Sequence, residues 1–195
     1  MPWSEAYFVG AFAVYVAIRA RVERQVGTSP SIDAPHAGAE RVLLGVMALG
    51  SVGVPAIYFL TPWLRWFDYE LPAAVAAVGV AVSLLALGLF WRSHADLGRN
   101  WSRTMVITAE QQLVTVGVYR HVRHPMYAAI WLFALAQGCL LHNGLAGWSA
   151  LVAFSPMYLF RVSREEAMMH RQFGHAYAEY CRGTGRLWPR RRRPV

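Results

Sequence analysis

Apolar runs without any charged residue alternate with short polar segments along the chain. Four of these runs, each of 17 to 21 residues, cover 42–60, 71–91, 125–141 and 143–160. About 20 apolar residues in a helix cross the hydrocarbon core of a bilayer. A weaker run at 6–18 becomes long enough when residues 3–21 are counted. The pattern predicts an all-α integral membrane protein of one domain, residues 1–195, with about five transmembrane helices at 3–21, 42–61, 71–92, 125–141 and 143–161.

Composition agrees with this pattern, since 56% of the residues are hydrophobic and 15% are charged. A soluble domain has about 25% charged residues. The first apolar run follows Glu5 instead of a basic segment, and its arginines come after it. A secretory signal has the opposite arrangement. We therefore expect this run to be a retained membrane anchor.

The basic residues indicate an orientation. All 19 are arginine, and 18 of them fall in segments on one side of the predicted membrane, with only Arg65 on the other. The positive-inside rule then places the N-terminus outside and the segments 93–124 and 162–195 in the cytoplasm. The net charge of +8 and the arginines at 190–193 suit contact with anionic membrane lipids. We expect no nucleic-acid partner, and the pattern indicates no particular oligomeric state.

A short turn places two polar segments next to each other. The sequence LHNGL at 141–145 predicts an antiparallel hairpin of the last two spans. The hairpin brings "RHPMY", at 123–127, beside the start of the segment 162–195. This neighbourhood is the candidate site. Pro55 and Pro156 lie inside spans, where kinks are expected.

Ionisable groups in this neighbourhood suggest its chemistry. Arg161 and Glu165 are four residues apart and share a helical face, whereas Glu166 points elsewhere. Such a pair is either an exposed ion pair or part of a site at the membrane surface. His121 and His124 stand between arginines without a nearby carboxylate or thiol, so no metal site is predicted. The chain has no lysine, which excludes Schiff-base chemistry.

Three motifs in fixed order resemble a known family. They are L-V-x-x-G-x-Y and R-H-P-x-Y within 111–127, and an E-E pair followed by F-G-x-x-Y-x-x-Y within 164–189. Together with 96–102 they cover about half the chain, and they resemble the integral-membrane isoprenylcysteine carboxyl methyltransferases and their prokaryotic relatives. Two departures are Ala129, where many relatives have glycine, and an E-E run that is shorter than in many of them.

The resemblance implies S-adenosylmethionine as cofactor. It implies that Arg161 faces the substrate, that Glu165 belongs to the cofactor side, and that Glu166 is the other candidate of the E-E pair for a catalytic role. The residues that would hold the cofactor, besides Glu165, are Gln111, Gln112, Leu113, Val114, Tyr119, Arg123, His124, Pro125, Met126 and Tyr127.

The implied reaction is carboxyl O-methylation of a prenylcysteine-like or other lipid carboxylate, so the partner is a lipophilic or lipidated acceptor. A carboxylate is ionised near pH 7 and needs no general base. Phospholipid N-methylation is a second possible reaction, in which Glu165 or Glu166 would accept a proton. The sequence is also compatible with a sterol-reductase-like enzyme that uses NADPH, or with a non-catalytic membrane scaffold.

Overall fold

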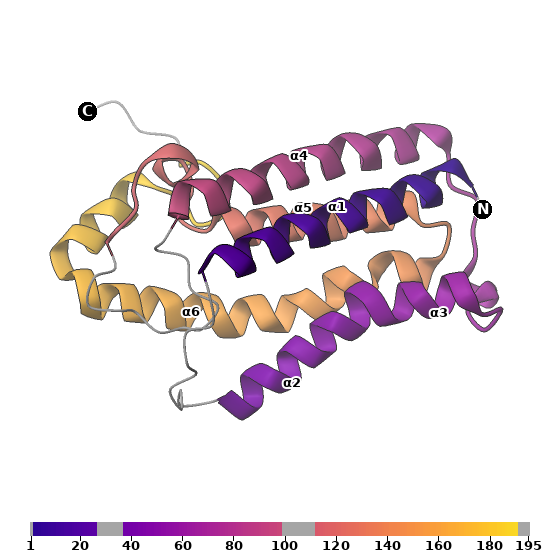
Figure 1. Cartoon of the computed structure of the whole chain (residues 1–195), viewed down its shortest axis with the longest axis horizontal. Coiled ribbons are helices and arrows are strands. Elements are labelled where there is room, and N and C mark those ends of the chain that lie inside the picture. The colour runs from indigo at the N-terminus through magenta and orange to yellow at the C-terminus, as the bar shows by residue number, and fades with distance from the viewer. Residues whose placement is uncertain (1, 27–36, 99–111, 191–195) are drawn as a thin grey trace.

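The computed structural model describes residues 2–26, 37–98 and 112–190, and these are almost entirely helical (Figure 1). Within them no β-strand forms, and two isolated bridges join loop residues. The α-helices are α1 (Trp3–Val26), α2 (Ala37–Ala48), α3 (Val54–Leu60), α4 (Ala73–Leu97), α5 (Pro125–Leu140) and α6 (Gly144–Gly183). A π-helical turn, η1 (Leu49–Gly53), joins α2 to α3.

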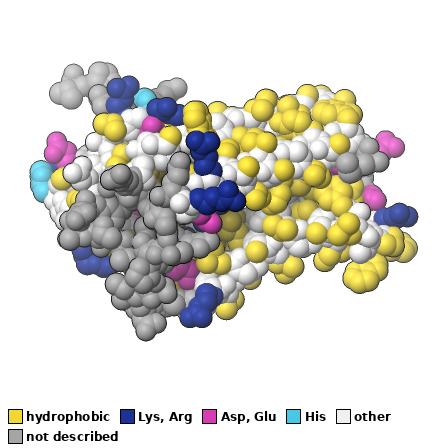
Figure 2. Space-filling model, viewed as in Figure 1, with side chains coloured by type: hydrophobic (Ala, Val, Ile, Leu, Met, Phe, Trp, Pro, Cys, Tyr) yellow, Lys and Arg dark blue, Asp and Glu magenta, His cyan; other side chains and the backbone are white. Residues whose placement is uncertain are grey.

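Three helical segments are long and apolar enough to cross a membrane, namely Gly38–Leu60, Ala73–Leu97 and Gly144–Gly183. α5 is apolar but shorter, and α1 is not among these three segments. The spans at α1 and α5 therefore stay predictions. Figure 2 shows hydrophobic side chains over most of the length of the bundle, with many of the charged side chains gathered toward one end. The expected all-α membrane protein is therefore confirmed, while the number of five spans remains a prediction.

Small residues let the helices approach closely. A Cβ added at Gly79 in α4 would lie 2.8 Å from the Cβ of Cys139 in α5. A Cβ at Gly50 in η1 would lie 2.6 Å from the carbonyl oxygen of Ser149 in α6. Glycine at such positions is a common means of packing membrane helices, because lipid supplies no hydrophobic force between them. The contacts hold α4, α5 and α6 with η1 in one bundle.

The predicted antiparallel hairpin is formed by α5 and α6. Asn143 caps α6, because its side chain accepts hydrogen bonds from the amides of Leu145 and Ala146 at 3.1 and 2.9 Å. Its Nδ2 donates to Leu64 O and Asp68 Oδ1, both at 2.7 Å. This buried cap ties the hairpin to the loop between α3 and α4.

The two expected kinks have different outcomes. Pro55 stands in the first turn of α3, directly after the π-helical turn, so the helix changes its geometry just before the proline. α6 keeps helical backbone angles through Pro156 and leaves them at Gly174, with φ 49° and ψ −120°. A positive φ costs glycine little. The bend at Gly174 turns the end of α6 back along the bundle (Figure 1).

The chain after α6 returns to the loop before α5. Gly185 forms a parallel bridge with Val122, and the amides of Arg123 and His124 donate to Gly185 O and Arg186 O at 2.8 and 3.0 Å. Tyr180 Oη donates to Tyr119 O at 2.6 Å. The expected contact of "RHPMY" with the start of the C-terminal segment is confirmed by the hydrogen bond from Tyr127 to Glu165, and the loop also contacts residues 180–186.

Candidate functional site

A cavity of about 510 Å³ lies between the helices and extends to the loop before α5. Its walls come from α1, α2, η1, α5 and α6, and residues 112–114 and Tyr119 close one end. The cavity is lined by most of the predicted site residues, namely Gln112, Leu113, Val114, Tyr119, Arg123, His124, Pro125, Met126, Tyr127, Arg161 and Glu165. Gln111 lies outside the described residues. Glu166 is not part of the lining.

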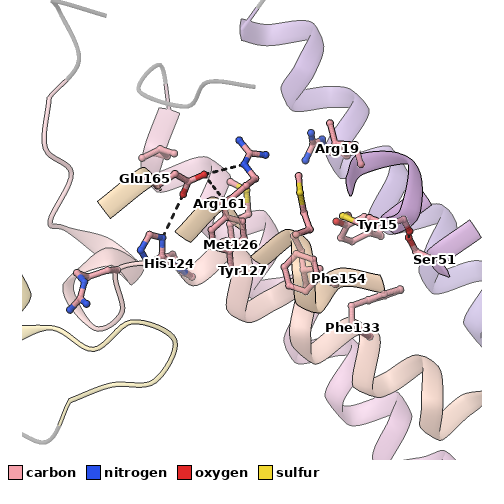
Figure 3. A pocket seen from close by; sticks show the side chains of 18 of the residues that line it. Tyr15, Arg19, Ser51, His124, Met126, Tyr127, Phe133, Phe154, Arg161 and Glu165 are labelled. Atoms are coloured by element: carbon pink, nitrogen blue, oxygen red, sulfur yellow. Dashed lines mark hydrogen bonds and ion pairs between the residues drawn. The ribbon is translucent and has the colours of Figure 1, made fainter. Parts of the chain in front are cut away.

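An ion pair stands at the polar end of the cavity. Arg161 Nε lies 3.3 Å from Glu165 Oε1, one helical turn further along α6. Glu165 also accepts a hydrogen bond from Tyr127 Oη, and its Oε2 lies 3.8 Å from His124 Nδ1 (Figure 3). Arg161 Nε is buried and makes no well-aligned hydrogen bond. The guanidinium therefore keeps unused capacity to bind an anion in the cavity.

A third charged residue, Glu40 of α2, contacts Arg161 from outside the cavity lining. Its Oε1 lies 3.6 Å from Arg161 Nε, and the two side chains are each 17% exposed. No role was predicted for Glu40 from the sequence. Its signal is an acidic residue two positions before the long apolar run at 42–60. Arg161 is thus held between carboxylates from two different helices.

Aromatic rings form the wall beside the carboxylate. The rings of His124 and Tyr127 stack with centroids 5.6 Å apart and an interplanar angle of 21°. Tyr119 is buried and donates from Oη to Ser93 O at 3.2 Å, and burial raises the pKa of Tyr119. Tyr177 and Tyr180, the tyrosines of the motif F-G-x-x-Y-x-x-Y, also line the cavity, although no role was predicted for them.

Glu166 binds a separate group of cations. It accepts hydrogen bonds from Arg123 Nη2 at 3.1 Å, His124 Nε2 at 3.3 Å and Arg186 Nε at 2.9 Å. Burial acts to raise the pKa of Glu166, but the hydrogen bonds from His124, Arg186 and Arg123 outweigh it and hold the pKa well below its usual range. Glu166 lies beyond residue 161, where the predicted span ends. Its contacts tie the end of the chain to the "RHPMY" loop.

We expect Glu166→Gln to loosen this tie. The lowered pKa means that the carboxylate stabilises the fold above its unfolded pKa of about 4.3, and this contribution is lost as the pH falls. The neutral amide loses the charge-assisted hydrogen bonds at every pH. Hydrogen exchange of the Arg123 and His124 amides should become about tenfold faster at neutral pH. Glu179→Gln, an exposed change on the same helix, is the control. Equal protection in both variants would show that Glu166 does not hold the loop.

Fold and cavity together define a class of protein: a helical integral membrane protein with a site that is polar at one end and apolar along its walls. Residues 77–171 match the profile of the isoprenylcysteine carboxyl methyltransferase (ICMT) family. The match includes the "RHPMY" loop and the Arg161–Glu165 pair. Nearly half of the chain, including the candidate site, is thus similar to the ICMT family.

Curated relatives and a solved structure agree with this placement. The protein-S-isoprenylcysteine O-methyltransferase of Schizosaccharomyces pombe is 30% identical over 104 residues, which are 51% of this chain and 44% of the relative. The nickel-cobalt-cadmium resistance protein NccN of Alcaligenes xylosoxydans xylosoxydans is 26% identical over 71% of this chain and 61% of its own length. The chain thus spans about half the length of these relatives.

The structural comparison supports the same fold. A solved structure of the eukaryotic intramembrane Ras methyltransferase ICMT superposes with a TM-score of 0.60 at 21% identity. The superposition covers 96% of this chain and 68% of that protein. The helical arrangement around the cavity is therefore shared with that structure.

Proposed function

We propose that the protein is an S-adenosylmethionine-dependent methyltransferase that acts on the carboxylate of a lipophilic acceptor. One observation carries the proposal: a single cavity joins the Arg161–Glu165 pair to walls of apolar side chains such as Phe133 and Phe154. A water-soluble cofactor and a membrane-soluble acceptor can meet in such a cavity. The match of residues 77–171 to the ICMT family supports the same reaction.

The residues at the polar end fit S-adenosylmethionine. This cofactor supplies a methyl group on a sulfonium cation, which the Glu165 carboxylate and the face of Tyr127 would stabilise. Leu113 and Val114 line the cavity in non-helical chain, and their backbone groups make no hydrogen bond within the part of the chain that the structure describes. They would hold the polar edge of the adenine ring.

Arg161 would bind the acceptor. Its guanidinium presents several N–H donors in a planar fork, which matches the geometry of a carboxylate. An ionised carboxylate attacks the methyl carbon in line and needs no general base. The residues then have to align the two reactants and exclude water, and alignment alone is worth several orders of magnitude in rate. Glu166 holds the loop and has no contact with the cavity.

The orientation belongs to the same proposal. The bend of α6 and the N-terminus lie at opposite ends of the bundle (Figure 1), and the residues at the polar end of the cavity come from the loop before α5 and from α6. The arginine-rich segments join the polar end, so the positive-inside rule places this end in the cytoplasm and the N-terminus outside. The cofactor would then enter from the cytoplasm.

Gly117 offers a test of the cofactor loop. It has φ 60°, and an added Cβ would lie 2.1 Å from Asp96 Oδ2, the oxygen that accepts the Val118 amide at 2.8 Å. Gly117→Ala should displace Tyr119 and weaken binding of S-adenosylmethionine by about tenfold or more, because a Cβ at positive φ alone costs about 1–3 kcal/mol and the contact with Asp96 adds to this cost. Equilibrium binding of the labelled cofactor measures this. Gly88→Ala, where a Cβ meets nothing within 4 Å, should bind normally.

The proposal as a whole is tested with detergent-purified protein and labelled S-adenosylmethionine. We expect saturable binding, and transfer of the label to N-acetyl-S-farnesyl-L-cysteine as a methyl ester that base hydrolyses. Absence of cofactor binding would remove the methyltransferase assignment. Base-stable label on phosphatidylethanolamine, without ester formation, would instead establish phospholipid N-methylation.

A further inference from the structure

Polar side chains also occur at the far end of the cavity, away from the ion pair. Gln137 in α5 and Ser51 in η1 line the cavity, and Gln137 is only 1% exposed. Figure 3 shows Ser51 and Phe133 on the opposite side of the cavity from Glu165. The surrounding wall residues here are mostly apolar, among them Val52, Phe133, Ala134 and Ala150, and Tyr15 lies beside Ser51 (Figure 3). A buried amide in such surroundings needs partners for its polar atoms.

The hydrogen bonds of Gln137 define which atom remains available. Nε2 donates to Ala146 O at 2.7 Å and to Ser149 Oγ at 3.4 Å. Because a carbonyl oxygen only accepts, the nitrogen has to face Ala146 and the amide cannot be turned round. Oε1 accepts no hydrogen bond from the residues that the structure describes. Gln137 thus has its donors in use and an acceptor to spare.

Ser51 lies at the same level of the bundle. Ser149 Oγ contacts Gln137 and donates to Gly50 O at 2.6 Å, so Ser149 connects Gln137 of α5 to the π-helical turn that carries Ser51. Ser51 Oγ donates its single proton to Met47 O, so the lone pairs of Ser51 Oγ are left to accept a hydrogen bond. Both side chains therefore offer acceptors to the cavity. The complementary group on a ligand is a hydrogen-bond donor.

Helix geometry gives the distance between the two ends. Gln137 is ten residues beyond Tyr127 in α5, or about 15 Å at 1.5 Å per residue. Ala150 and Arg161, which both line the cavity from α6, are separated by a similar length of about 16 Å. An extended hydrocarbon chain of roughly 12 carbons, with bonds of about 1.5 Å in a zigzag, covers this distance.

We propose that Gln137 and Ser51 form a subsite for a hydroxyl group at the far end of the acceptor's hydrocarbon tail. The acceptor would be an ω-hydroxylated lipid carboxylate, with its carboxylate at Arg161 and its hydroxyl at Gln137. The placement of the carboxylate rests on the proposed function. A tail without the hydroxyl leaves the acceptors unsatisfied, and it binds less well for that reason.

A matched pair of ligands tests the subsite without any methyl transfer. Laurate and ω-hydroxylaurate would each displace the fluorescent lipid cis-parinaric acid from the purified full chain in nanodiscs. For the wild type we expect the ratio of dissociation constants to favour ω-hydroxylaurate by about five- to tenfold relative to the ratio for Gln137→Leu. Comparison with the variant cancels the different partitioning of the two acids into the bilayer.

Two further variants keep the test decisive. Ser149→Ala removes the hydrogen bonds to Gln137 Nε2 and Gly50 O but not the free acceptors, so it should keep the preference for the hydroxyl. Ser51→Ala should reduce the preference even if Gln137→Leu fails to fold. Equal ratios in the wild type and in either subsite variant would overturn the subsite. Failure of the proposed function would appear separately, as absence of cofactor binding.

Discussion

Arg161→Ala should lower kcat/KM for methyl transfer by about 10²- to 10³-fold. The guanidinium lines the polar end of the cavity beside Glu165, and its Nε makes no well-aligned hydrogen bond of its own. Without it the acceptor carboxylate loses charge-assisted hydrogen bonds and its alignment with the methyl carbon. Cofactor affinity should change by less than about threefold if Glu165 remains in place. Single-turnover transfer and equilibrium binding of the labelled cofactor separate the two effects.

Arg164 provides the matched control for this change. Arg164 lies on the same helix and does not line the cavity. Its Nη1 donates to Phe160 O at 3.1 Å, and its guanidinium stands 3.6 Å from the centre of the Phe160 ring. Arg164→Ala should keep kcat/KM within about twofold. Arg161→Lys keeps the charge without the planar fork, so it should fall between alanine and the wild type. Full transfer by Arg161→Ala would refute its role in binding the acceptor.

Local patterns were enough to predict much of the architecture. The apolar runs predicted the helices, and the short LHNGL turn predicted that the "RHPMY" loop and the start of the segment after the last span meet. The hydrogen bond from Tyr127 to Glu165 confirms that meeting. The separation of Glu165 from Glu166 followed from helical periodicity, since consecutive residues point about 100° apart on a helix. The motifs then suggested the residues that line the cavity.

Features that depend on how distant helices pack were not predicted. Glu40 reaches Arg161 only because α2 lies against α6, and no spacing in the sequence relates residues so far apart. Arg186 reaches Glu166 because α6 bends at Gly174. Proline is the familiar signal for a kink, so the sequence predicted a kink at Pro156 and not at Gly174. Gln137 is one polar residue in an apolar run, and its hydrogen bond to Ala146 O in α6 depends on how the two helices pack.

Glu165→Gln should weaken binding of S-adenosylmethionine by about 10- to 100-fold. Glu165 is the carboxylate of the E-E pair that lines the cavity, and it lies between Arg161 and the His124–Tyr127 wall. Two unit charges about 4 Å apart interact by about 4 kcal/mol at the effective dielectric constant of a protein surface. Arg161 offsets part of this attraction for a sulfonium cation, so we expect about half of it to be lost. Glutamine keeps the size of the side chain and its acceptor for Tyr127 Oη.

Variants of Glu165 and Arg161 distinguish binding of the cofactor from binding of the acceptor. Glu165→Gln should raise the dissociation constant of the cofactor while transfer at saturating cofactor falls by less than about tenfold, whereas Arg161→Ala should show the reverse pattern. Glu179→Gln, an exposed change on the same helix, should bind the cofactor as the wild type does. Normal cofactor affinity in Glu165→Gln would place the sulfonium away from this carboxylate. Since Arg161 and Glu165 are in contact, the double variant should lose less transition-state free energy than the sum of the losses in the two single variants.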